Sequence, residues 1–573
     1  MVAAVPPAAV SATPATQVAF TDNVVSEQRG DVAEIGVAFE DGDTATVRIG
    51  SEASHVATVT VRDRDGDGRA LLRLNTYDGS VAASDGDATT VRSRSNVTTP
   101  LATGTYDLAL WSGNDTDGDQ RSVATLSLSE RSTDNLFARA APSSADLSNL
   151  SEVNAALRSD NLTRSGVLVR NGTLVLELLA SGLTGAVAAQ DGRNVTERFV
   201  RFLEQENASL TVYDVPGTEQ ERAYLDLTNE SAVTVVRDAR NDSYYVVAEL
   251  DEVAMTDGDD GDPANNHRGW GDHRANFSLA ADSSLTTDGR ETATAEFEVD
   301  EAEATLSTPP ETDKVYLAPA PNQTVWGTTT LAPGSRVAVR IRDGDGLRRS
   351  ETVRVENRTD APGGSFAANF DLGEVAPETE LGVTVRAAGE SSLTHGEETD
   401  GVVLESNAAL NLTGREPTDQ GVGVSYATLS HGGYVAVHRG SADGPVVGRS
   451  SRLAPGEAFS HAIELGSKSG GDATLVAVAH RAEPGDELGR PYTENGNVVA
   501  EAVERTGATT TDDETATVRT TATATTRTTE TTVESTPTAG PSAETGIPGF
   551  GVGAATVGAL VALLAGLALA RRE

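Results

Sequence analysis

The stretch Ala33-Glu-Ile-Gly-Val-Ala-Phe39 decides the fold class of this chain, because large apolar residues alternate in it with small or charged ones. In an extended strand its odd-numbered residues would share one face and its even-numbered residues the other. The same period of two returns at residues 57–61 and 106–110. Turns rich in Asp and Gly separate such segments about every eight to twelve residues. The sequence therefore predicts a mainly β protein with several immunoglobulin-like or β-sandwich domains in tandem.

Changes in this pattern divide the chain into domains. We expect a β-sandwich over residues 17–132, an α+β domain over 145–310, a second β-sandwich over 313–408 and a small β domain over 409–506. In the α+β segment, Val195, Phe199 and Phe202 recur at helical spacing after Asp191-Gly192. This spacing predicts one amphipathic helix between the strands.

The composition shows a strong excess of acidic residues. There are 86 acidic and 44 basic residues, the formal net charge is −42, and Lys314 and Lys468 are the two lysines. Such a surface suits concentrated salt, because carboxylates hold water and counterions while molar salt screens their repulsion within roughly 3 Å. The charge excludes nucleic acid as a partner, since phosphates would be repelled. The lack of cysteine excludes disulfides and cysteine-based zinc sites.

The C-terminal region predicts an attachment to a membrane. Residues 507–546 hold 17 threonines in 40 positions and no aromatic residue, which predicts a disordered Thr-rich stalk. Residues 552–570 carry no charge and are long enough to cross most of a bilayer core of ~30 Å as a transmembrane helix. Arg571-Arg572 follow and would stay in the cytoplasm, which leaves the domains outside the cell.

The tripeptide Pro548-Gly549-Phe550 stands between the stalk and the apolar segment. With its flanks, over residues 547–573, it resembles the PGF-CTERM sorting signal of archaeal surface glycoproteins. In that family an archaeosortase cleaves near the tripeptide and attaches a lipid. The resemblance implies an archaeosortase as processing partner and a mature anchor made of lipid, as in a lipoprotein, instead of the helix. At the other end, residues 1–16 are short and apolar without a basic start, and we interpret them as the remnant of a truncated signal peptide.

Asparagines in the sequence Asn-x-Ser/Thr are unusually frequent. Thirteen of the 23 asparagines fit it, where chance would give roughly four or five. This excess indicates an exported glycoprotein. The candidate N-glycosylation sites are Asn96, Asn114, Asn149, Asn161, Asn171, Asn194, Asn207, Asn229, Asn241, Asn276, Asn322, Asn357 and Asn411.

Three further stretches carry a resemblance to a family. They are Phe20-Thr-Asp-Asn-Val-Val-Ser-Glu-Gln-Arg-Gly-Asp31, Gly104-Thr-Tyr-Asp107 and Asn322-Gln-Thr-Val-Trp-Gly-Thr-Thr-Thr-Leu-Ala-Pro-Gly334. Over roughly residues 17–407 the chain is similar to haloarchaeal BGTF-type surface proteins. The last β domain resembles a module common in surface proteins of halophiles, through Val447-Gly-Arg-Ser-Ser-Arg-Leu-Ala-Pro-Gly456 and Arg490-Pro-Tyr-Thr493. Both resemblances imply a place at the cell surface and an architecture, without catalytic residues.

One acidic turn resembles half of a calcium loop. Asp63, Asp65 and Asp67 occupy positions 1, 3 and 5, and Gly68 occupies position 6. Leu74 stands at position 12, where a bidentate carboxylate belongs. The three aspartates are therefore weak metal candidates, and we expect loosely bound cations and no cofactor.

The sequence names no catalytic residue. Four histidines (His431, His438, His461 and His480) share the last domain with many serines, so composition alone leaves a triad open. However, the motifs G-x-S-x-G and H-E-x-x-H and the P-loop are absent from the sequence. Paired carboxylates for glycoside hydrolysis stay open among so many acids. We predict that the chain is not an enzyme.

These observations together indicate a structural or interaction glycoprotein of the haloarchaeal cell surface, in or beside the S-layer. We expect it to be anchored to the plasma membrane at its C-terminus and to contact itself or other surface glycoproteins. The alternatives are an adhesin that binds a ligand and, less favoured, an anchored hydrolase.

Overall fold

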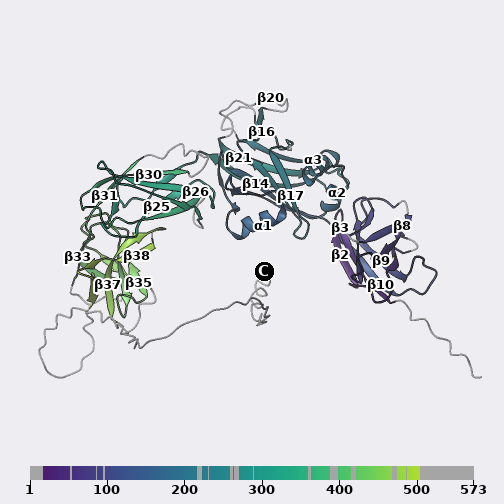
Figure 1. The fold of residues 1–573 in the computed structure, drawn as a ribbon, viewed down its shortest axis with the longest axis horizontal. Coiled ribbons are helices and arrows are strands. Elements are labelled where there is room, and N and C mark those ends of the chain that lie inside the picture. Colours follow the sequence, from purple (N-terminus) through teal and green to yellow (C-terminus); the bar gives the residue numbers. More distant parts are fainter. Residues whose placement is uncertain are drawn as a thin grey trace, which may run out of the picture. The chain divides into compact units, whose positions relative to one another are not determined.

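The computed structural model describes residues 17–503 except residues 52–53, 85–86, 95–96, 216–221, 230, 258–261, 264–269, 288, 359–362, 388–397, 414–420, 467–473 and 486 (Figure 1). This part of the chain forms 41 strands and three helices, and the prediction of a mainly β protein is confirmed. The predicted signal remnant, stalk and C-terminal apolar segment lie outside the described residues. Within the described residues, no helix has the length and hydropathy needed to cross a bilayer.

The first domain is a sandwich of two sheets. The alternating stretch that predicted the fold is the central part of β3, and Ala33, Ile35 and Val37 are fully buried between the sheets. One sheet has the order β1-β3-β6-β7 and the other β2-β10-β9-β4-β5-β8. The strands are β1 (Val18–Phe20), β2 (Val24–Gln28), β3 (Val32–Phe39), β4 (Thr44–Ile49), β5 (Ala57–Arg62), β6 (Arg69–Asn75), β7 (Val81–Ala83), β8 (Ala88–Arg94), β9 (Gly104–Ser112) and β10 (Ser122–Ser129).

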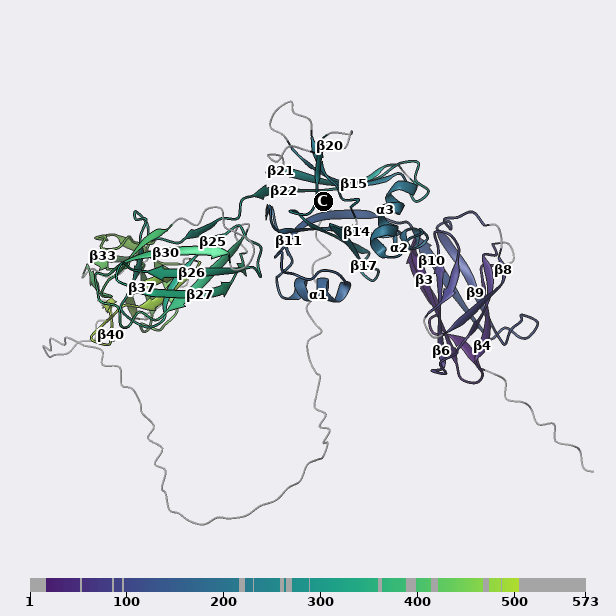
Figure 2. The same ribbon diagram turned by 45° about the horizontal axis from the view of Figure 1, so that its top comes forward.

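The middle domain combines two sheets with helices. The predicted helix is present as α3 (Val195–Gln205), where Phe199 and Phe202 pack into the core and Asn194 caps the N-terminus. Two further helices, α1 (Leu150–Arg158) and α2 (Thr184–Ala188), were not predicted. Figures 1 and 2 show α2 and α3 side by side at one end of this domain, and the backbone nitrogens of Gly185 and Ala186 in α2 donate to the Gly30 carbonyl of the first domain.

The strands of the middle domain begin before the predicted boundary at residue 145. β11 (Thr133–Ala141) pairs with β14 (Thr173–Ala180) and so belongs to this domain. The sheet orders are β12-β11-β14-β18-β17 and β13-β22-β21-β15-β16-β19-β20. The remaining strands are β12 (Thr163–Arg164), β13 (Val167–Val169), β15 (Ala208–Asp214), β16 (Ala223–Leu225), β17 (Val233–Asp238), β18 (Ser243–Glu249), β19 (Met255–Asp257), β20 (Asp262–Pro263), β21 (Gly271–Leu279) and β22 (Glu291–Asp300).

The third domain repeats the strand connectivity of the first. Its sheets have the orders β23-β25-β29-β28 and β24-β31-β30-β26-β27, which correspond to β1-β3-β6 and β2-β10-β9-β4-β5 of the first domain. In both domains the second strand pairs in parallel with the last one. The strands are β23 (Ala304–Leu306), β24 (Val315–Leu317), β25 (Gln323–Thr329), β26 (Arg336–Arg342), β27 (Arg348–Arg354), β28 (Glu356–Asn357), β29 (Gly364–Phe370), β30 (Glu380–Ala387) and β31 (Thr399–Val403).

The last domain is a smaller β structure around its own core. The central pair is β34 and β37, whose residues Val435, Val437 and Ala477 are fully buried. The strands are β32 (Ala408–Leu412), β33 (Gly421–Leu429), β34 (Tyr434–Arg439), β35 (Val446–Arg449), β36 (Ala462–Glu464), β37 (Leu475–Glu483), β38 (Glu487–Pro491), β39 (Thr493–Glu494), β40 (Asn497–Val498) and β41 (Ala500–Val503).

Candidate functional site

The acidic turn after β5 brings its three aspartates together. One carboxylate oxygen of each of Asp63, Asp65 and Asp67 lies within 4.8 Å of the others. Asp63 is buried, and its two oxygens accept hydrogen bonds from the backbone nitrogens of Gly66 (2.7 Å) and Gly68 (2.9 Å). Asp65 and Asp67 are exposed. Asp63 therefore holds the turn through the backbone, and loosely bound cations at these carboxylates stay a prediction.

Most candidate glycosylation sites are on the surface. Of the twelve sequon asparagines that the structure describes, ten are exposed, while Asn161 and Asn276 are half-buried. The Oδ1 atom of Asn161 accepts a hydrogen bond from Arg354. Asn276 lies within β21, paired on both sides with β15 and β22. Asn96 and the predicted sorting residues Pro548, Gly549 and Phe550 lie outside the described residues.

A buried carboxylate joins the first domain to the middle domain. Asp31, between β2 and β3, is 3% exposed, and its oxygens accept hydrogen bonds from the backbone nitrogens of Gly182 (2.5 Å) and Thr184 (2.7 Å). Burial raises the pKa of Asp31, and these two hydrogen bonds oppose the shift. Gly30 and Gly182 have φ of 97° and 73°, and a Cβ on Gly30 would lie 2.1 Å from the Gly182 oxygen. The two backbones therefore touch at this junction, and only glycine fits there.

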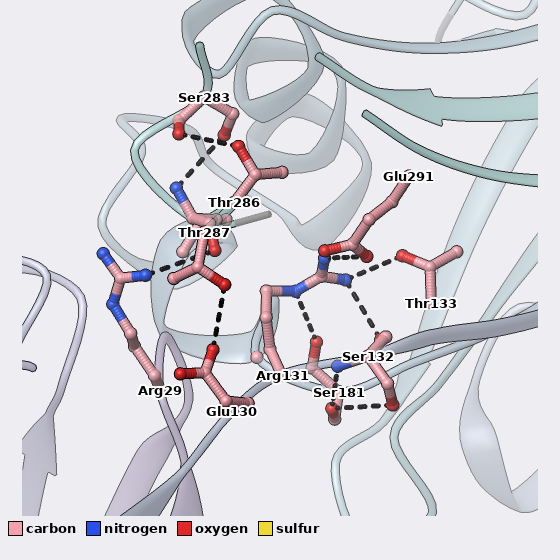
Figure 3. A network of polar contacts seen from close by, with 12 residues as sticks. Arg29, Glu130, Arg131, Ser132, Thr133, Ser181, Ser283, Thr286, Thr287 and Glu291 are labelled. Atoms are coloured by element: carbon pink, nitrogen blue, oxygen red, sulfur yellow. Dashed lines mark hydrogen bonds and ion pairs between the residues drawn. The ribbon is translucent and has the colours of Figure 1, made fainter. Parts of the chain in front are cut away.

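A network around Arg131 extends the same junction (Figure 3). The buried guanidinium of Arg131 forms an ion pair with Glu291 and donates to the Ser181 carbonyl at 3.1 Å. From the first domain, Arg29 donates to the carbonyl of Ser284 at 2.8 Å. The Thr287 hydroxyl donates to Glu130 at 3.1 Å. The first domain is thus attached both to the end of β14 and to the connection between β21 and β22.

Acidic groups crowd together beside this junction. Partial burial, together with the charges of Asp31, Asp242 and Glu34, raises the pKa of Glu27 to about 7. Partial burial and the charge of Asp31 also raise the pKa of Asp242 to about 6. Carboxylates in such a cluster favour protons or cations, because their negative charges repel each other.

A second junction joins the third domain to the last. Arg481 of β37 donates to the side-chain oxygen of Gln323 at 3.0 Å, and the guanidinium carbon of Arg452 lies 5.5 Å from the centre of the Trp326 ring. His431 is buried here. Burial, followed by the charge of Arg481, lowers the pKa of His431 to about 3. The ring is therefore neutral near pH 7 and adds no second positive charge beside Arg481.

The structure brings two of the four histidines of the last domain together. The Nε2 atoms of His438 and His480 lie 3.0 Å apart, and their Nδ1 atoms lie 2.7 and 2.8 Å from the carbonyl oxygens of Gly444 and Gly489. Carbonyls only accept, so both Nδ1 atoms donate. The Nδ1 hydrogen bonds therefore fasten a turn and an edge strand to the sheet, a structural role that sequence spacing did not indicate.

The remaining histidines form no triad. The Ser430 hydroxyl lies 2.8 Å from Nδ1 of His431, but the groups that influence this ring are Arg481 and the carbonyls of Leu317 and Leu404. His461 packs edge-on against Phe459. A serine nucleophile needs a histidine that a carboxylate orients. None of these contacts within the described residues supplies that arrangement.

Two family descriptions match parts of the chain. Residues 10–118 match a domain of unknown function (DUF7827), and residues 408–518 match another domain of unknown function (DUF7282). The two matches include the predicted cation turn and the histidine pair, respectively.

Curated relatives match much longer parts. A cell surface glycoprotein of Haloferax gibbonsii is 32% identical over 419 residues, which are 69% of this chain and 46% of that protein. Cell surface glycoprotein 1 of Haloarcula hispanica is 29% identical over 85% of this chain and 56% of its own length. Cell surface glycoprotein 2 of the same organism is 27% identical over 84% of this chain and 56% of its own length. The chain spans about half the length of the curated relatives it matches.

Solved structures give weaker likenesses. A tetra-tandem repeat from the extending region of a large adhesion protein covers 85% of this chain and 99% of its own, with 14% identity and a TM-score of 0.16. The BSP domain of a biofilm-associated protein covers 88% and 100%, with 10% identity and a TM-score of 0.15. The sequence matches carry the identification: over most of its length this chain is a homologue of the haloarchaeal cell surface glycoproteins.

Proposed function

We propose that the chain is a non-enzymatic structural glycoprotein of the haloarchaeal cell surface, in or beside the S-layer, exported and anchored to the plasma membrane at its C-terminus. The observation that carries this proposal is its homology over most of its length with cell surface glycoproteins. The exposed position of ten sequon asparagines supports a glycosylated outer surface.

The domain junctions support a structural role. At the first junction, Asp31, Arg131 and two touching backbones join domains through buried contacts. At the second, Arg481 and Arg452 contact the third domain. Contacts of this kind limit relative motion of neighbouring domains, as a surface scaffold requires.

The anchor is the part of the proposal that rests on sequence alone. A stalk over residues 507–546 would hold the domains away from the membrane. The apolar segment after Pro548-Gly549-Phe550 would either span the membrane or be exchanged for lipid by an archaeosortase. Neighbouring copies or other surface glycoproteins would be the lateral partners.

Fractionation of haloarchaeal cells that express the tagged chain tests this proposal. We expect the chain in the envelope fraction, with glycans at exposed sequons and release by detergent. A variant that ends at residue 546 should be secreted into the medium instead. Recovery of the full chain from the cytoplasm, without glycans, would refute the proposal. Envelope localisation without regular arrays in electron micrographs, together with binding to a ligand or another cell, would favour the adhesin.

A further inference from the structure

One face of the third domain carries a concentration of arginines. In β26 and β30 the outward residues alternate with buried ones, and the antiparallel register places four residues of the edge strand β27 on the same face, which gives twelve residues in all. Six of the twelve are arginines and one, Glu380, is acidic. We call these six the arginine face: Arg336, Arg340, Arg342, Arg348, Arg354 and Arg386.

This concentration runs against the composition of the chain. Acidic residues outnumber basic ones by 86 to 44, so most surface regions are expected to be negative. All six arginines are exposed. The opposite side of the same strands, with Val337, Val339 and Ile341, packs into the core, so the arginines cannot turn inward.

The register of the strands places like charges directly opposite each other. Arg336 faces Arg354, and Arg342 faces Arg348, across the pair β26–β27. Opposed like charges destabilise a sheet, because their side chains lie only about 5 Å apart at Cβ. The isolated domain therefore gains nothing from this arrangement, whereas a surface rich in carboxylates would relieve the repulsion.

Within the described residues, two of the six arginines have side-chain partners, and Asp400 of β31 lies opposite Gly382 at one edge of the face. Arg342 forms an ion pair with Glu398, and Arg354 donates to the Ser159 carbonyl and to Asn161. The side chains of the other four have no ion pair or hydrogen bond within the part of the chain that the structure describes: Arg336, Arg340, Arg348 and Arg386. Four guanidinium groups are therefore left for a partner.

We propose that the arginine face docks an acidic surface of a second copy of this chain. Guanidinium groups match carboxylates through two parallel hydrogen bonds, and such direct contacts persist at short range where salt screens longer-range attraction. A second copy supplies the complementary charge, since the chain carries a net charge of −42. The choice of a second copy rests on the proposed function, in which copies lie side by side on the cell surface.

The face is large enough to direct an interface and too small to form one alone. Three strands of seven or eight residues cover about 10 Å by 20 Å, whereas a stable interface buries about 800 Å² on each partner. The arginines would therefore select the partner surface and its orientation, and neighbouring regions would add the remaining contact area.

Charge reversal in the full chain tests the inference. The triple variant Arg336→Glu, Arg340→Glu and Arg386→Glu removes the positive face. The matched control is Arg64→Glu, Arg69→Glu and Arg121→Glu, which changes the net charge equally at exposed positions of the first domain. Self-association is measured by sedimentation velocity over a range of protein concentrations, in the salt in which the chain is folded.

We expect the face variant to associate at least tenfold more weakly than the unmodified chain and the control to associate within about twofold of it. The melting temperature of the face variant should not fall, because Glu at position 336 would lie opposite Arg354. This result separates lost docking from lost folding.

Three results would overturn the inference. The unmodified chain could stay monomeric at all concentrations, or the face variant could associate as strongly as the control. The face could also bind polyglutamate or an anionic polysaccharide while the chain does not self-associate, which would assign it to another acidic partner. Envelope fractionation is independent of these assays, so failure of the proposed function and failure of this inference remain distinguishable.

Discussion

The carboxylate of Asp31 is buried, and hydrogen bonds from two backbone nitrogens replace the hydration that it loses on folding. Each of its oxygens has one donor from the middle domain, at 2.5 and 2.7 Å. A buried donor left without an acceptor costs about 1–3 kcal/mol. Asp31 is therefore a residue of the first domain whose contribution to stability depends on the middle domain.

The first prediction concerns this residue. Asp31→Ala should lower the free energy of unfolding by about 2–4 kcal/mol, because the nitrogens of Gly182 and Thr184 would lose their acceptor. Urea unfolding in molar salt measures the change. Asp107→Ala, at an exposed position of β9, should change stability by less than about 0.5 kcal/mol. Equal effects of the two substitutions would show that Asp31 does not hold the junction.

At the scale of single residues, the sequence indicated some roles and could not indicate others. The sequence predicted α3 because Val195, Phe199 and Phe202 follow each other at intervals of about one helical turn. Asp31 and its partners are about 150 positions apart, so no local pattern relates them. The pair His438 and His480 became visible only through the strand pairing of β34 and β37.

Among the elements, the turn after β5 shows that aspartates with the spacing of metal ligands can instead accept hydrogen bonds from the backbone. Asp63 caps the turn through Gly66 and Gly68, which leaves two exposed carboxylates for ions. A calcium loop needs at least six oxygen ligands, with a bidentate acid at position 12. Position 12 is Leu74, a buried core residue of β6.

The second prediction concerns the removal of metal ions. Chelation of divalent cations by EDTA in molar KCl should leave the melting temperature of the first domain unchanged. Asp63→Ala should lower it with or without calcium, because the backbone nitrogens of Gly66 and Gly68 lose their acceptor. Asp65→Ala serves as the control and should have little effect. A calcium-dependent rise in melting temperature that Asp65→Ala abolishes would establish a specific site.

The third prediction concerns glycans and the elements that carry them. We expect glycans at Asn171 and Asn357, which are exposed, and none at Asn161 or Asn276 in the folded protein. Asn276 lies in a strand paired on both sides, and Asn161 is held by Arg354. Glycopeptide mass spectrometry of the envelope protein measures the occupancy. Full occupancy of Asn276 would mean that glycans are added before β21 pairs.

Helices α1 and α2 show why some elements escaped prediction. α1 begins at a capping asparagine, Asn149, with Glu152 in its first turn, which is a recognisable helix start. The same asparagine opens the sequon Asn149-Leu-Ser151, so one local pattern indicates both a glycosylation site and a helix start. α2 has five residues and an apolar sequence without a capping side chain, so no local signal marks it. Its position depends on contacts of its first residues with the first domain.

Across the whole molecule, acidification has opposite effects on stability: it favours the folded state at the junction around Asp31 and the unfolded state in the last domain. Glu27 and Asp242 have folded pKa values of about 7 and 6, above their ordinary values of 4.5 and 3.8. Between about pH 4 and pH 7 the folded state therefore binds more protons than the unfolded state. By linkage, this contribution to stability is full at low pH and is lost as the pH rises through 7.

His431 has the reverse effect on the last domain. Its folded pKa of about 3 lies below the ordinary value of 6.5. The unfolded chain binds the proton first, so stability falls as the pH falls from about 6.5 towards 3. Burial and the neighbouring His438 also lower the pKa of His480, which adds to the same trend.

The fourth prediction combines the two effects. On acidification from pH 7 to pH 5, the junction around Asp31 should become more protected and the last domain less protected. Hydrogen exchange with peptide resolution measures this, after correction for the intrinsic effect of pH on exchange. In a His431→Gln variant, the pH dependence of the last domain should shrink. A uniform change along the whole chain would contradict the assignment to these groups.

The parallel strand pairs of the sandwiches have a mechanical consequence. In the first domain β2 runs parallel to β10, and in the third β24 runs parallel to β31, so an early strand of each domain lies beside its last strand. A pull on the chain ends would slide these strands past each other and load their hydrogen bonds together. Antiparallel strands pulled from one end would instead open one bond at a time. Tension along the chain would therefore load each parallel pair in shear once the short first strands, β1 and β23, have detached from their antiparallel partners.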